Sequence, residues 1–337
     1  MSAVRAGVVG VGHFGRLHAE KLAADEMSDL VAVADVDAER ARGVAARHGV
    51  RAVTDHRELV GAVDAVTIAV PTIAHHEVAR FFLEHGVHVL VEKPFASTIA
   101  EADDLIALAR ARGLALQVGH LERFSCFGSG LFEKVTTPLY IEALRIAPFR
   151  PRGLDVGVVH DLMIHDIDLV SYLVGAPITS VDAVGAPVLG EREDIVNARI
   201  TFETGCVATV TASRVAFKSE RRLRVFQPDG LLSIDLLNKR GAFISKTYKD
   251  GTPHFDVEER TLGEHDSLGS EISSFLHAVA EGTEPVVTGE DGREAMRIAD
   301  RIGESLRRHF ALVQSRALRP GAGTGGAAED RGVRRRV

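Results

Sequence analysis

Short aliphatic runs alternate with longer helical patterns over the first 118 residues of the chain. The runs are VRAGVVG, DLVAVAD, DAVTIAV, GVHVLVE and GLALQVG. Helical periodicity separates them, at Phe14–Ala24, Ala38–Arg47, Ala74–His85 and Ile99–Arg112. This order is typical of βαβ units, so the pattern predicts an α/β fold in which a doubly wound parallel sheet carries helices on both faces.

The pattern changes after about residue 120. A helical segment near 159–174 precedes several alternating stretches, among them NARITFETGCVATVTASR, in which Glu203-Thr204-Gly205 can form a hairpin turn. A second turn is expected at Gln227-Pro228-Asp229-Gly230, and helical patterns at Glu271–Glu281 and Glu290–His309 close the region. The second half is therefore expected to be α+β, with a mostly antiparallel open sheet.

These patterns divide the chain into two domains and a tail. We expect a parallel-sheet domain at 1–120 and an α/β domain at 121–314, whose final helices can pack back on the first domain. Residues 315–337 are rich in Gly, Ala and Arg and show no hydrophobic period. Such a segment cannot recover the entropy lost on ordering, so it is predicted to be a disordered tail.

Composition and charge exclude several classes of protein. With 45% hydrophobic residues the chain can build two cores, and no window approaches the roughly 18 uninterrupted apolar residues of a membrane span. A net charge of −7 argues against nucleic-acid binding, which needs clustered Lys and Arg. Cys126 and Cys206 lie outside any CxxC spacing, so neither a disulfide framework nor a thiolate zinc site is expected. We expect a cytoplasmic protein.

A glycine loop, GVGHFG at residues 10–15, directly follows the first predicted strand and opens a helix. In this context G-x-G-x-x-G predicts a dinucleotide site. Gly10 permits the tight turn, Gly12 lets the backbone approach a pyrophosphate, and Gly15 lets helix and strand pack closely. The phosphates would lie at the positive end of the helix dipole. The alternative is a glycine turn that binds no nucleotide.

The next predicted strand ends in VAVADVD, which places Asp35 25 positions after Gly10. A carboxylate at about that distance meets the ribose 2′-hydroxyl of NAD and would repel the 2′-phosphate of NADP. NAD is therefore favoured, although Asp37 with Arg40 and Arg42 leaves NADP open.

Lys93, in HVLVEKPFA, is the only lysine between residues 22 and 133, where the chain otherwise uses arginine. A partly buried ammonium can change its pKa and exchange a proton, whereas arginine stays charged. Lys93 follows an apolar strand, at the sheet edge where doubly wound folds bind ligands, and Pro94 restricts its backbone. We therefore predict a functional amine. The alternative is a lysine that pairs with Glu92 at a strand end.

The stretch VVHDLMIHDIDL at 158–169 sets ionisable side chains among aliphatic ones. At about 100° per residue, Asp161, His165, Asp168 and Tyr172 fall within a band roughly 60° wide on an otherwise apolar helix. A metal site, a satisfied buried network, and a general acid/base at His165 oriented by Asp161 are competing interpretations. The glycine loop and the lysine favour the last. No further His/Asp/Glu cluster completes a coordination shell, so no metal is expected.

Taken together, GVGHFG, EKP and D-x-x-x-H-x-x-D resemble the glucose–fructose oxidoreductase/inositol dehydrogenase family (Gfo/Idh/MocA) of NAD(P)-dependent sugar and cyclitol dehydrogenases. PTIAHHEVA (71–79), QVGHLERF (117–124) and EISSFLHAVAEGTEPVVTGEDGREA (271–295) are similar to further motifs of that family. The resemblance implies an NAD-binding Rossmann domain joined to a domain with an open sheet that often mediates oligomerisation, hence a homodimer or homotetramer. The substrate would lie between the domains.

The resemblance also implies roles for individual residues. Lys93, Asp161 and His165 are expected to be the catalytic group, with the histidine usually assigned as acid/base and Asp168 as structural. The expected cofactor contacts are Gly10, Gly12, His13, Phe14, Gly15, Asp35, Pro71, Thr72, His75, Glu92 and Lys93.

A closer similarity is to the branch of the family that acts on UDP-N-acetylglucosamine at its 3-hydroxyl. That branch has stretches like VGHxERFNP and DVGVVxDLxxHDID, where this chain has VGHLERFSCF and DVGVVHDLMIHDID. The similarity implies oxidation of the UDP-sugar to its 3-keto form. Candidate contacts to this substrate are Arg123, Arg145, Arg150, Arg152 and His160.

Two rival functions remain open. The same fold could oxidise a free sugar or inositol, which would not require the UDP group. A non-enzymatic dinucleotide-binding regulator would keep GVGHFG but would have no need for Lys93 together with His165.

Overall fold

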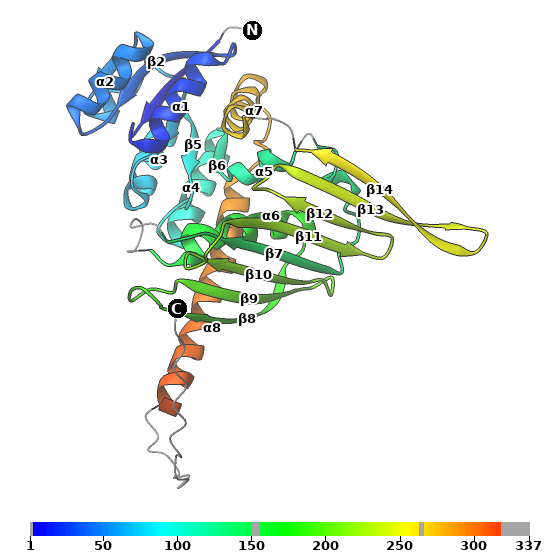
Figure 1. The fold of residues 1–337 in the computed structure, drawn as a ribbon. Helices are drawn as coiled ribbons and strands as arrows, with labels where there is room; N and C mark the ends of the chain where they lie inside the picture. Colours follow the sequence, from blue (N-terminus) through cyan, green and yellow to red (C-terminus); the bar gives the residue numbers. More distant parts are fainter. Residues whose placement is uncertain (1–2, 128, 150–155, 263–265, 318–337) are drawn as a thin grey trace, which may run out of the picture.

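The computed structural model describes residues 3–127, 129–149, 156–262 and 266–317. Two sheets with their helices make up the molecule (Figure 1). Both predicted sheet types are confirmed. The first part of the chain forms a six-stranded parallel sheet, and the second part forms an eight-stranded, mostly antiparallel sheet.

The first sheet is doubly wound, with the strand order β3-β2-β1-β4-β5-β6 and parallel pairing throughout. Its strands are β1 (Val4–Val9), β2 (Ser28–Ala34), β3 (Arg51–Val53), β4 (Ala65–Ile68), β5 (His88–Glu92) and β6 (Leu116–Gly119). The helices between them are α1 (His13–Ala24), α2 (Ala38–His48), α3 (His75–Glu84) and α4 (Ile99–Arg112). The order reverses between β1 and β4, which places the ligand-binding crevice at the carboxyl ends of these strands.

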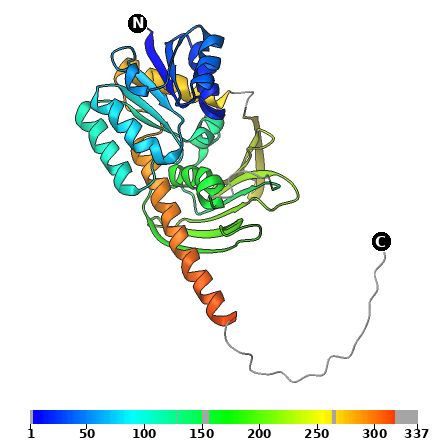
Figure 2. The same cartoon turned by 90° about the vertical axis from the view of Figure 1, so that its left-hand side faces the viewer.

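Both faces of this sheet are buried, because successive residues of a strand point to opposite faces. On β5, Val91 belongs to the core that includes Phe82 of α3, whereas Leu90 belongs to the core that includes Phe275. Phe275 lies on α7 (Ser267–Glu281), which comes from the end of the chain. Helix α7 therefore returns to pack beside α1 on the N-terminal sheet (Figure 2).

Local sequence signals set the helix ends. Thr98 precedes α4 and its Oγ1 accepts the backbone N–H of Glu101 at 3.2 Å. Gly113 ends the same helix with a φ of 64°, a left-handed conformation that favours glycine. These two signals explain why the predicted helix Ile99–Arg112 agrees with the observed one.

The second sheet has the strand order β14-β13-β12-β11-β7-β10-β9-β8. Its strands are β7 (Tyr140–Ile146), β8 (Ile178–Ala186), β9 (Ile195–Phe202), β10 (Val207–Ser213), β11 (Glu220–Gln227), β12 (Gly230–Asp235), β13 (Arg240–Lys249) and β14 (Thr252–Thr261). Neighbours are antiparallel except β7 and β10, which are parallel. Both predicted hairpins are confirmed, between β9 and β10 and between β11 and β12.

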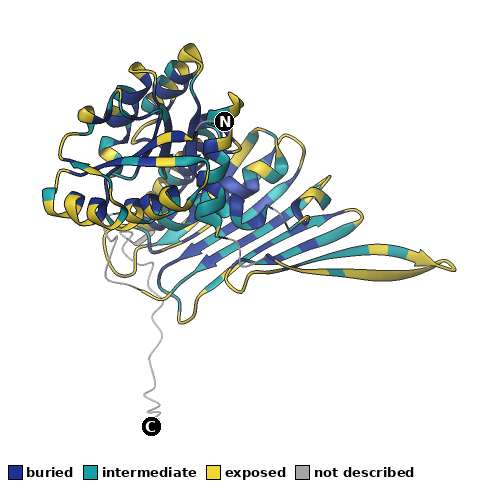
Figure 3. Cartoon of the chain, turned by 90° about the horizontal axis from the view of Figure 1, so that it is seen from above, coloured by how far each residue is buried: buried dark blue, intermediate teal, exposed yellow. Residues whose placement is uncertain are grey.

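One face of the second sheet is covered and the other is open. Helices α6 (Ile164–Val174) and α8 (Gly289–Ala317) supply Ile167 and Ile298 to a core that includes Ile141 of β7. A short helix, α5 (Leu121–Cys126), joins the two parts of the chain. The hairpin β13–β14 projects beyond the rest of the sheet and is largely exposed (Figure 3).

Helix α8 is longer than predicted and extends away from the body of the molecule (Figures 1 and 2). It continues past His309 to Ala317, so the first three residues of the predicted tail, 315–317, are helical. The remainder of that tail, residues 318–337, lies outside the described residues. Within the described part of the chain, no helix combines the length and the apolarity needed to cross a membrane.

Candidate active site

The glycine loop joins β1 to α1 at the crevice of the first sheet. Gly10 has a φ of 83°, and a Cβ on it would lie 2.8 Å from the backbone of Ala69. A Cβ on Gly15 would lie 1.7 Å from the carbonyl oxygen of Gly10, so both positions require glycine. A Cβ on Gly12 would meet nothing within 4 Å, and no described side chain caps α1. The loop leaves an open, positively polarised helix end that fits a pyrophosphate.

Asp35 follows β2 and braces this loop. Its Oδ2 accepts the backbone N–H of Val11 at 2.9 Å, and its Oδ1 lies 3.2 Å from Nη1 of Arg40. Asp35, Arg40, Gly10 and Gly12 all line one cavity of about 550 Å³. A cavity of this size accommodates a nucleotide-sized group. The residues present therefore fit the dinucleotide that the glycine loop predicts.

The other cofactor residues expected at the mouth of this crevice are accessible. His13 and Phe14 are exposed at the start of α1, with their rings edge to face and the centroids 5.3 Å apart. Pro71 lines the cavity from the loop after β4, and Thr72 follows it. Contact between these four side chains and a cofactor stays a prediction.

His75 and Glu92 make hydrogen bonds within the protein. The two ring nitrogens of His75 lie 2.8 and 2.9 Å from backbone oxygens in the loops after β5 and β4. Glu92 Oε1 lies 2.8 Å from Nε2 of His18 on α1, and its Oε2 accepts the backbone N–H of Lys93 at 3.2 Å. Both side chains brace the loops that surround the crevice, and the cofactor contact expected of them stays a prediction.

Lys93 extends from the end of β5 to the second part of the chain. Its Nζ donates a hydrogen bond to the backbone oxygen of Asp161 at 3.0 Å and lies 3.8 Å from Oδ1 of the same residue. The peptide bond between Lys93 and Pro94 is cis. Burial lowers the pKa of Lys93, and the nearby carboxylates of Asp161 and Glu92 offset part of this effect. The fold therefore brings Lys93 and Asp161 together from opposite sides of the domain junction.

His165 lies four residues after Asp161, in the first turn of α6. The preceding residues Val159–Met163 form a π-helical turn, a feature that is frequent at functional sites. Nδ1 of His165 is buried and has no hydrogen-bond partner among the described residues. Burial and the positive charges of Lys93 and Arg145 hold the pKa of His165 well below its usual value. The imidazole is therefore neutral at neutral pH.

The polar residues predicted to share one stripe of this helix have different partners in the structure. Asp161 makes no hydrogen bond to His165 within the described part of the chain, so the orienting contact expected between them is not observed. Asp168 is buried and accepts two hydrogen bonds from the Arg123 guanidinium, at 2.8 and 2.6 Å. Tyr172 is 45% exposed, and its ring centroid lies 4.8 Å from Cζ of Arg123. Asp168 therefore has the structural role that the family resemblance implied.

Two arginines expected at a substrate diphosphate are instead buried in ion pairs. Arg123, besides its contact with α6, lies 3.1 Å from Asp291 of α8. Arg145 is 3% exposed; it donates to Asp166 at 2.8 and 3.0 Å and to Glu122 at 2.8 Å. Because two carboxylates already match each guanidinium, neither is available to a diphosphate. We reassign both as anchors that hold α6 to the elements around it.

The remaining substrate candidates are not placed beside Lys93. Arg150 and Arg152 fall outside the described residues. His160 is 41% exposed, and its Nε2 lies 3.9 Å from Oδ1 of Asp300, so it lies against α8. As for the metal interpretation, no group of three or more His, Cys, Asp or Glu in the described ranges could hold a metal ion.

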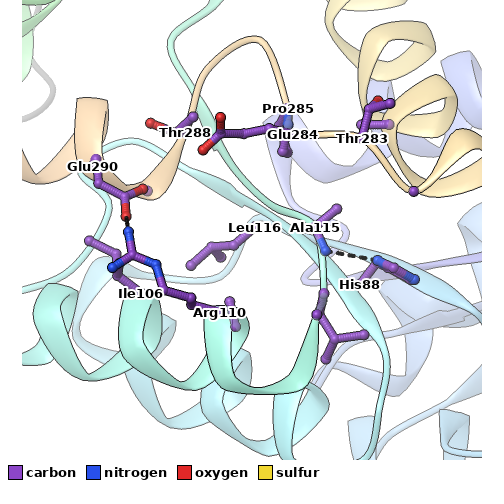
Figure 4. Close-up of a pocket in the computed structure, with 16 residues that line it drawn as sticks. His88, Ile106, Arg110, Ala115, Leu116, Thr283, Glu284, Pro285, Thr288 and Glu290 are labelled. Carbon is purple, nitrogen blue, oxygen red and sulfur yellow. Dashed lines mark hydrogen bonds and ion pairs between the residues drawn. The ribbon is translucent and has the colours of Figure 1, made fainter.

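A second cavity, of about 270 Å³, lies on another side of the first domain (Figure 4). It is bounded by α4 and by the connection between α7 and α8. Arg110 and Glu290 form an ion pair of 2.7 Å across one end, and Nδ1 of His88 accepts the backbone N–H of Ala115 at 2.9 Å. None of the predicted site residues lines this cavity.

A buried polar cluster lies where α7 packs on the first sheet. Gln117 of β6 donates its Nε2 to the backbone oxygen of Glu271 at 3.0 Å. Both carboxyl oxygens of Glu271 are buried without a hydrogen-bond partner among the described residues. Burial and the neighbouring carboxylates of Glu92 and Asp168 raise the pKa of Glu271 well above its usual value. Burial therefore favours the protonated form of Glu271 over the carboxylate.

Comparison with known proteins identifies the family. Residues 4–120 match the model of an oxidoreductase family with an NAD-binding Rossmann fold, and residues 147–233 match the Gfo/Idh/MocA C-terminal domain. The chain belongs to the Gfo/Idh/MocA family. As a Gfo/Idh/MocA dehydrogenase it is an oxidoreductase that acts on CH–OH groups of sugar-type substrates, with an NAD-binding Rossmann domain.

Individual members of the Gfo/Idh/MocA family resemble the chain over most of its length. UDP-N-acetylglucosamine 3-dehydrogenase of Acidithiobacillus ferrooxidans is 41% identical, over 88% of this chain and 95% of that protein. A solved structure of that enzyme matches with a TM-score of 0.87, covering 92% of this chain and 99% of the other. Myo-inositol 2-dehydrogenase of Thermotoga maritima is 29% identical, over 90% and 96% of the two chains.

The raised pKa of Glu271 predicts a pH-dependent effect of Glu271→Gln. The wild-type folded state must retain a proton that the unfolded state releases above its pKa near 4.5, so folding becomes less favourable as pH rises. Glutamine does not titrate. The stability difference in favour of the variant should therefore increase from about pH 5 to about pH 8, by up to about 1.4 kcal/mol per pH unit.

Thermal unfolding at the two pH values measures this difference. Glu281→Gln, at an exposed position of the same helix, is the matched control. A Glu271→Gln effect that is the same at both pH values would show that Glu271 is ionised in the folded protein.

Proposed function

We propose that this protein oxidises the 3-hydroxyl of UDP-N-acetylglucosamine to the 3-keto sugar nucleotide, with NAD as the oxidant. The observation that carries the reaction is the contact between Lys93 Nζ and Asp161, because it joins an amine at the cofactor crevice to the turn that precedes His165. The substrate rests on the 41% identity to an enzyme of that name, together with the resemblance of VGHLERF and DVGVVHDLMIHDID to stretches of that branch of the family.

The cofactor would lie across the carboxyl edge of the first sheet. The backbone around Gly12 and the start of α1 would hold its pyrophosphate, and Asp35 would accept a hydrogen bond from its adenosine ribose. The carboxylate of Asp35 favours NAD over NADP, because a 2′-phosphate would be repelled there. When bound, NAD supplies the acceptor for the hydride of the sugar carbon.

The proton of the hydroxyl would pass to His165. Its imidazole is neutral at neutral pH because burial and the nearby cations lower its pKa, so a ring nitrogen can accept a proton. Lys93, as an ammonium, would donate a hydrogen bond to the oxygen on which negative charge develops. Asp161 would hold Lys93 in place through its backbone oxygen and its carboxylate.

A second candidate is the oxidation of a free sugar or an inositol at the same site. The 29% identity to a myo-inositol 2-dehydrogenase over nearly the whole chain favours keeping it. The two candidates use the same cofactor and the same Lys93 and His165, so they differ only in whether the UDP group is needed.

The assembly would be a homodimer or homotetramer that forms through the open face of the second sheet. An apolar row crosses five strands of this face in register. Its members are Tyr140, Phe226, Leu231, Ile244 and Val257. The Tyr140 and Phe226 rings stack with centroids 5.6 Å apart, and Val257 is 57% exposed. A continuous apolar row on an accessible face is typical of subunit interfaces.

A substrate panel tests the proposed activity. The purified protein should reduce NAD, followed by NADH absorbance, with UDP-N-acetylglucosamine, and should do so far more slowly with NADP. Free N-acetylglucosamine and myo-inositol are the comparison substrates. Turnover of a free polyol without turnover of the UDP-sugar would transfer the assignment to the second candidate. Binding of NAD with no turnover of any substrate would contradict both.

The catalytic roles predict the effects of three substitutions. His165→Ala and Lys93→Ala should each lower kcat by about 10²-fold or more, because each removes a group that acts on the reacting proton or oxygen. His160→Ala, a histidine of the same segment that lies against α8, should retain kcat within about threefold. NADH binding, measured by fluorescence, should be retained in all three. Near-normal kcat in His165→Ala or Lys93→Ala would contradict the role given to that residue.

The proposed interface predicts that charge in the apolar row separates the subunits. Leu231→Glu with Ile244→Glu places two carboxylates directly opposite each other across β12 and β13, so the mass in solution should fall to that of the monomer. Val286→Glu, at an apolar position that is 49% exposed between α7 and α8, is the control. Light scattering measures the mass. An unchanged oligomer in the double variant would place the interface elsewhere.

A further inference from the structure

Three arginines gather at one end of the covered face of the second sheet, and they differ in exposure. Arg145 of β7 and Arg214, which follows β10, are 3% and 7% exposed, and each binds carboxylates. Arg221 of β11 is 47% exposed at the side chain. Its ion pair with Oε1 of Glu122 is long, at 3.5 Å. Arg221 is therefore a cation that remains largely accessible to a ligand.

Strand register places Arg221 beside the candidate site. Arg221 pairs with Arg145 across β11 and β7, so both side chains point to the same face of the sheet. Both contact the same oxygen of Glu122, and Arg145 in turn binds Asp166, the residue after His165. The charge of Arg221 is also one of the causes that lower the pKa of His165.

We propose that Arg221 binds the diphosphate of a nucleotide-sugar substrate. The proposal rests on the proposed function, and it names the residue that makes the UDP group necessary. A guanidinium fits phosphate oxygens through two parallel N–H donors, and such charge-assisted pairs are stronger than neutral hydrogen bonds. The long contact with Glu122 is one that a diphosphate can replace without leaving a carboxylate unpaired, because Glu122 keeps its 2.8 Å bond to Arg145.

This position also explains how discrimination between candidate substrates arises. Lys93 and His165 act on a hydroxyl that sugars and inositols share, so they cannot distinguish a UDP-sugar from a free sugar. Arg123 and Arg145 are already neutralised within the protein. Of the arginine candidates in the described ranges, Arg221 supplies an accessible cation for a diphosphate close to His165.

Kinetics and binding of Arg221→Ala test this assignment in the full-length protein. The variant should raise KM for UDP-N-acetylglucosamine by about 10- to 100-fold, with kcat within about threefold and KM for NAD unchanged. Its affinity for UDP, measured by calorimetry, should fall by a similar factor, whereas its weak affinity for uridine should not change. Arg221→Lys should have a KM and a UDP affinity between those of the wild type and Arg221→Ala, because lysine keeps the charge but lacks the two parallel N–H donors.

Arg297→Ala is the matched control, since Arg297 is also exposed and paired with a glutamate, on α8. It should behave as the wild type. If Arg221→Ala binds UDP as tightly as the wild type, or loses kcat and melting temperature without a change in UDP affinity, Arg221 is a structural residue and the assignment is wrong. If the wild type itself does not oxidise UDP-N-acetylglucosamine, the proposed function fails first, and the diphosphate site is overturned with it.

Discussion

Two buried arginine–carboxylate pairs fix helix α6, and the geometry of the site depends on them. Asp166 binds Arg145 of β7, and Asp168 binds Arg123 of α5, each through both carboxyl oxygens. Removing one partner from such a pair leaves an uncompensated buried charge, which costs roughly 3–5 kcal/mol. The helix is therefore held in one orientation against the second sheet and against the junction with the first domain, and His165 takes its position from that orientation.

The same arrangement determines the electrostatics of the proposed catalytic residues. Arg145 and Lys93 both lie close enough to His165 to lower its pKa, while Asp161 and Glu92 stabilise the ammonium of Lys93. In the proposed mechanism the imidazole accepts a proton while the Lys93 ammonium stabilises negative charge on oxygen. Lys93 comes from the carboxyl edge of the first sheet and His165 from the second domain, so the site is complete only when the two domains are packed together.

Much of the fold follows from the sequence because local patterns determine it. Short aliphatic runs predicted the parallel strands, and alternating residues predicted the antiparallel ones. Turn residues predicted both hairpins, and all these signals act within a few positions of the chain. The roles of the loop glycines were also predicted, because their spacing directly follows a strand. In the structure, Gly10 and Gly15 have no space for a Cβ. Strand β3 was missed because three residues are too few to show a period. Helix α8 extends past its predicted end at His309, and Phe310, the next residue, still packs against the core of the second sheet.

The parts of the site that were missed depend on long-range contacts. The helical wheel assumed about 100° per residue, but the π-helical turn at Val159–Met163 departs from that spacing. No sequence rule pairs Arg123 with Asp168, 45 positions away, or Arg145 with Asp166, 21 positions away. Both arginines were therefore assigned to the substrate. Arg221 did have a signal. In ERRLRVFQ it is in phase with the buried Leu223 and Val225, which marks a cation on the covered face of a strand.

In the proposed reaction, a hydride leaves C3 of the sugar ring of UDP-N-acetylglucosamine. The most direct test is to supply that substrate with deuterium at C3 and to analyse the reduced cofactor by mass spectrometry. Deuterium should appear in the reduced nicotinamide, and the hydride step should be slower than with the unlabelled sugar. Reduced cofactor that contains no deuterium, formed while the label stays on the sugar, would contradict the proposed reaction.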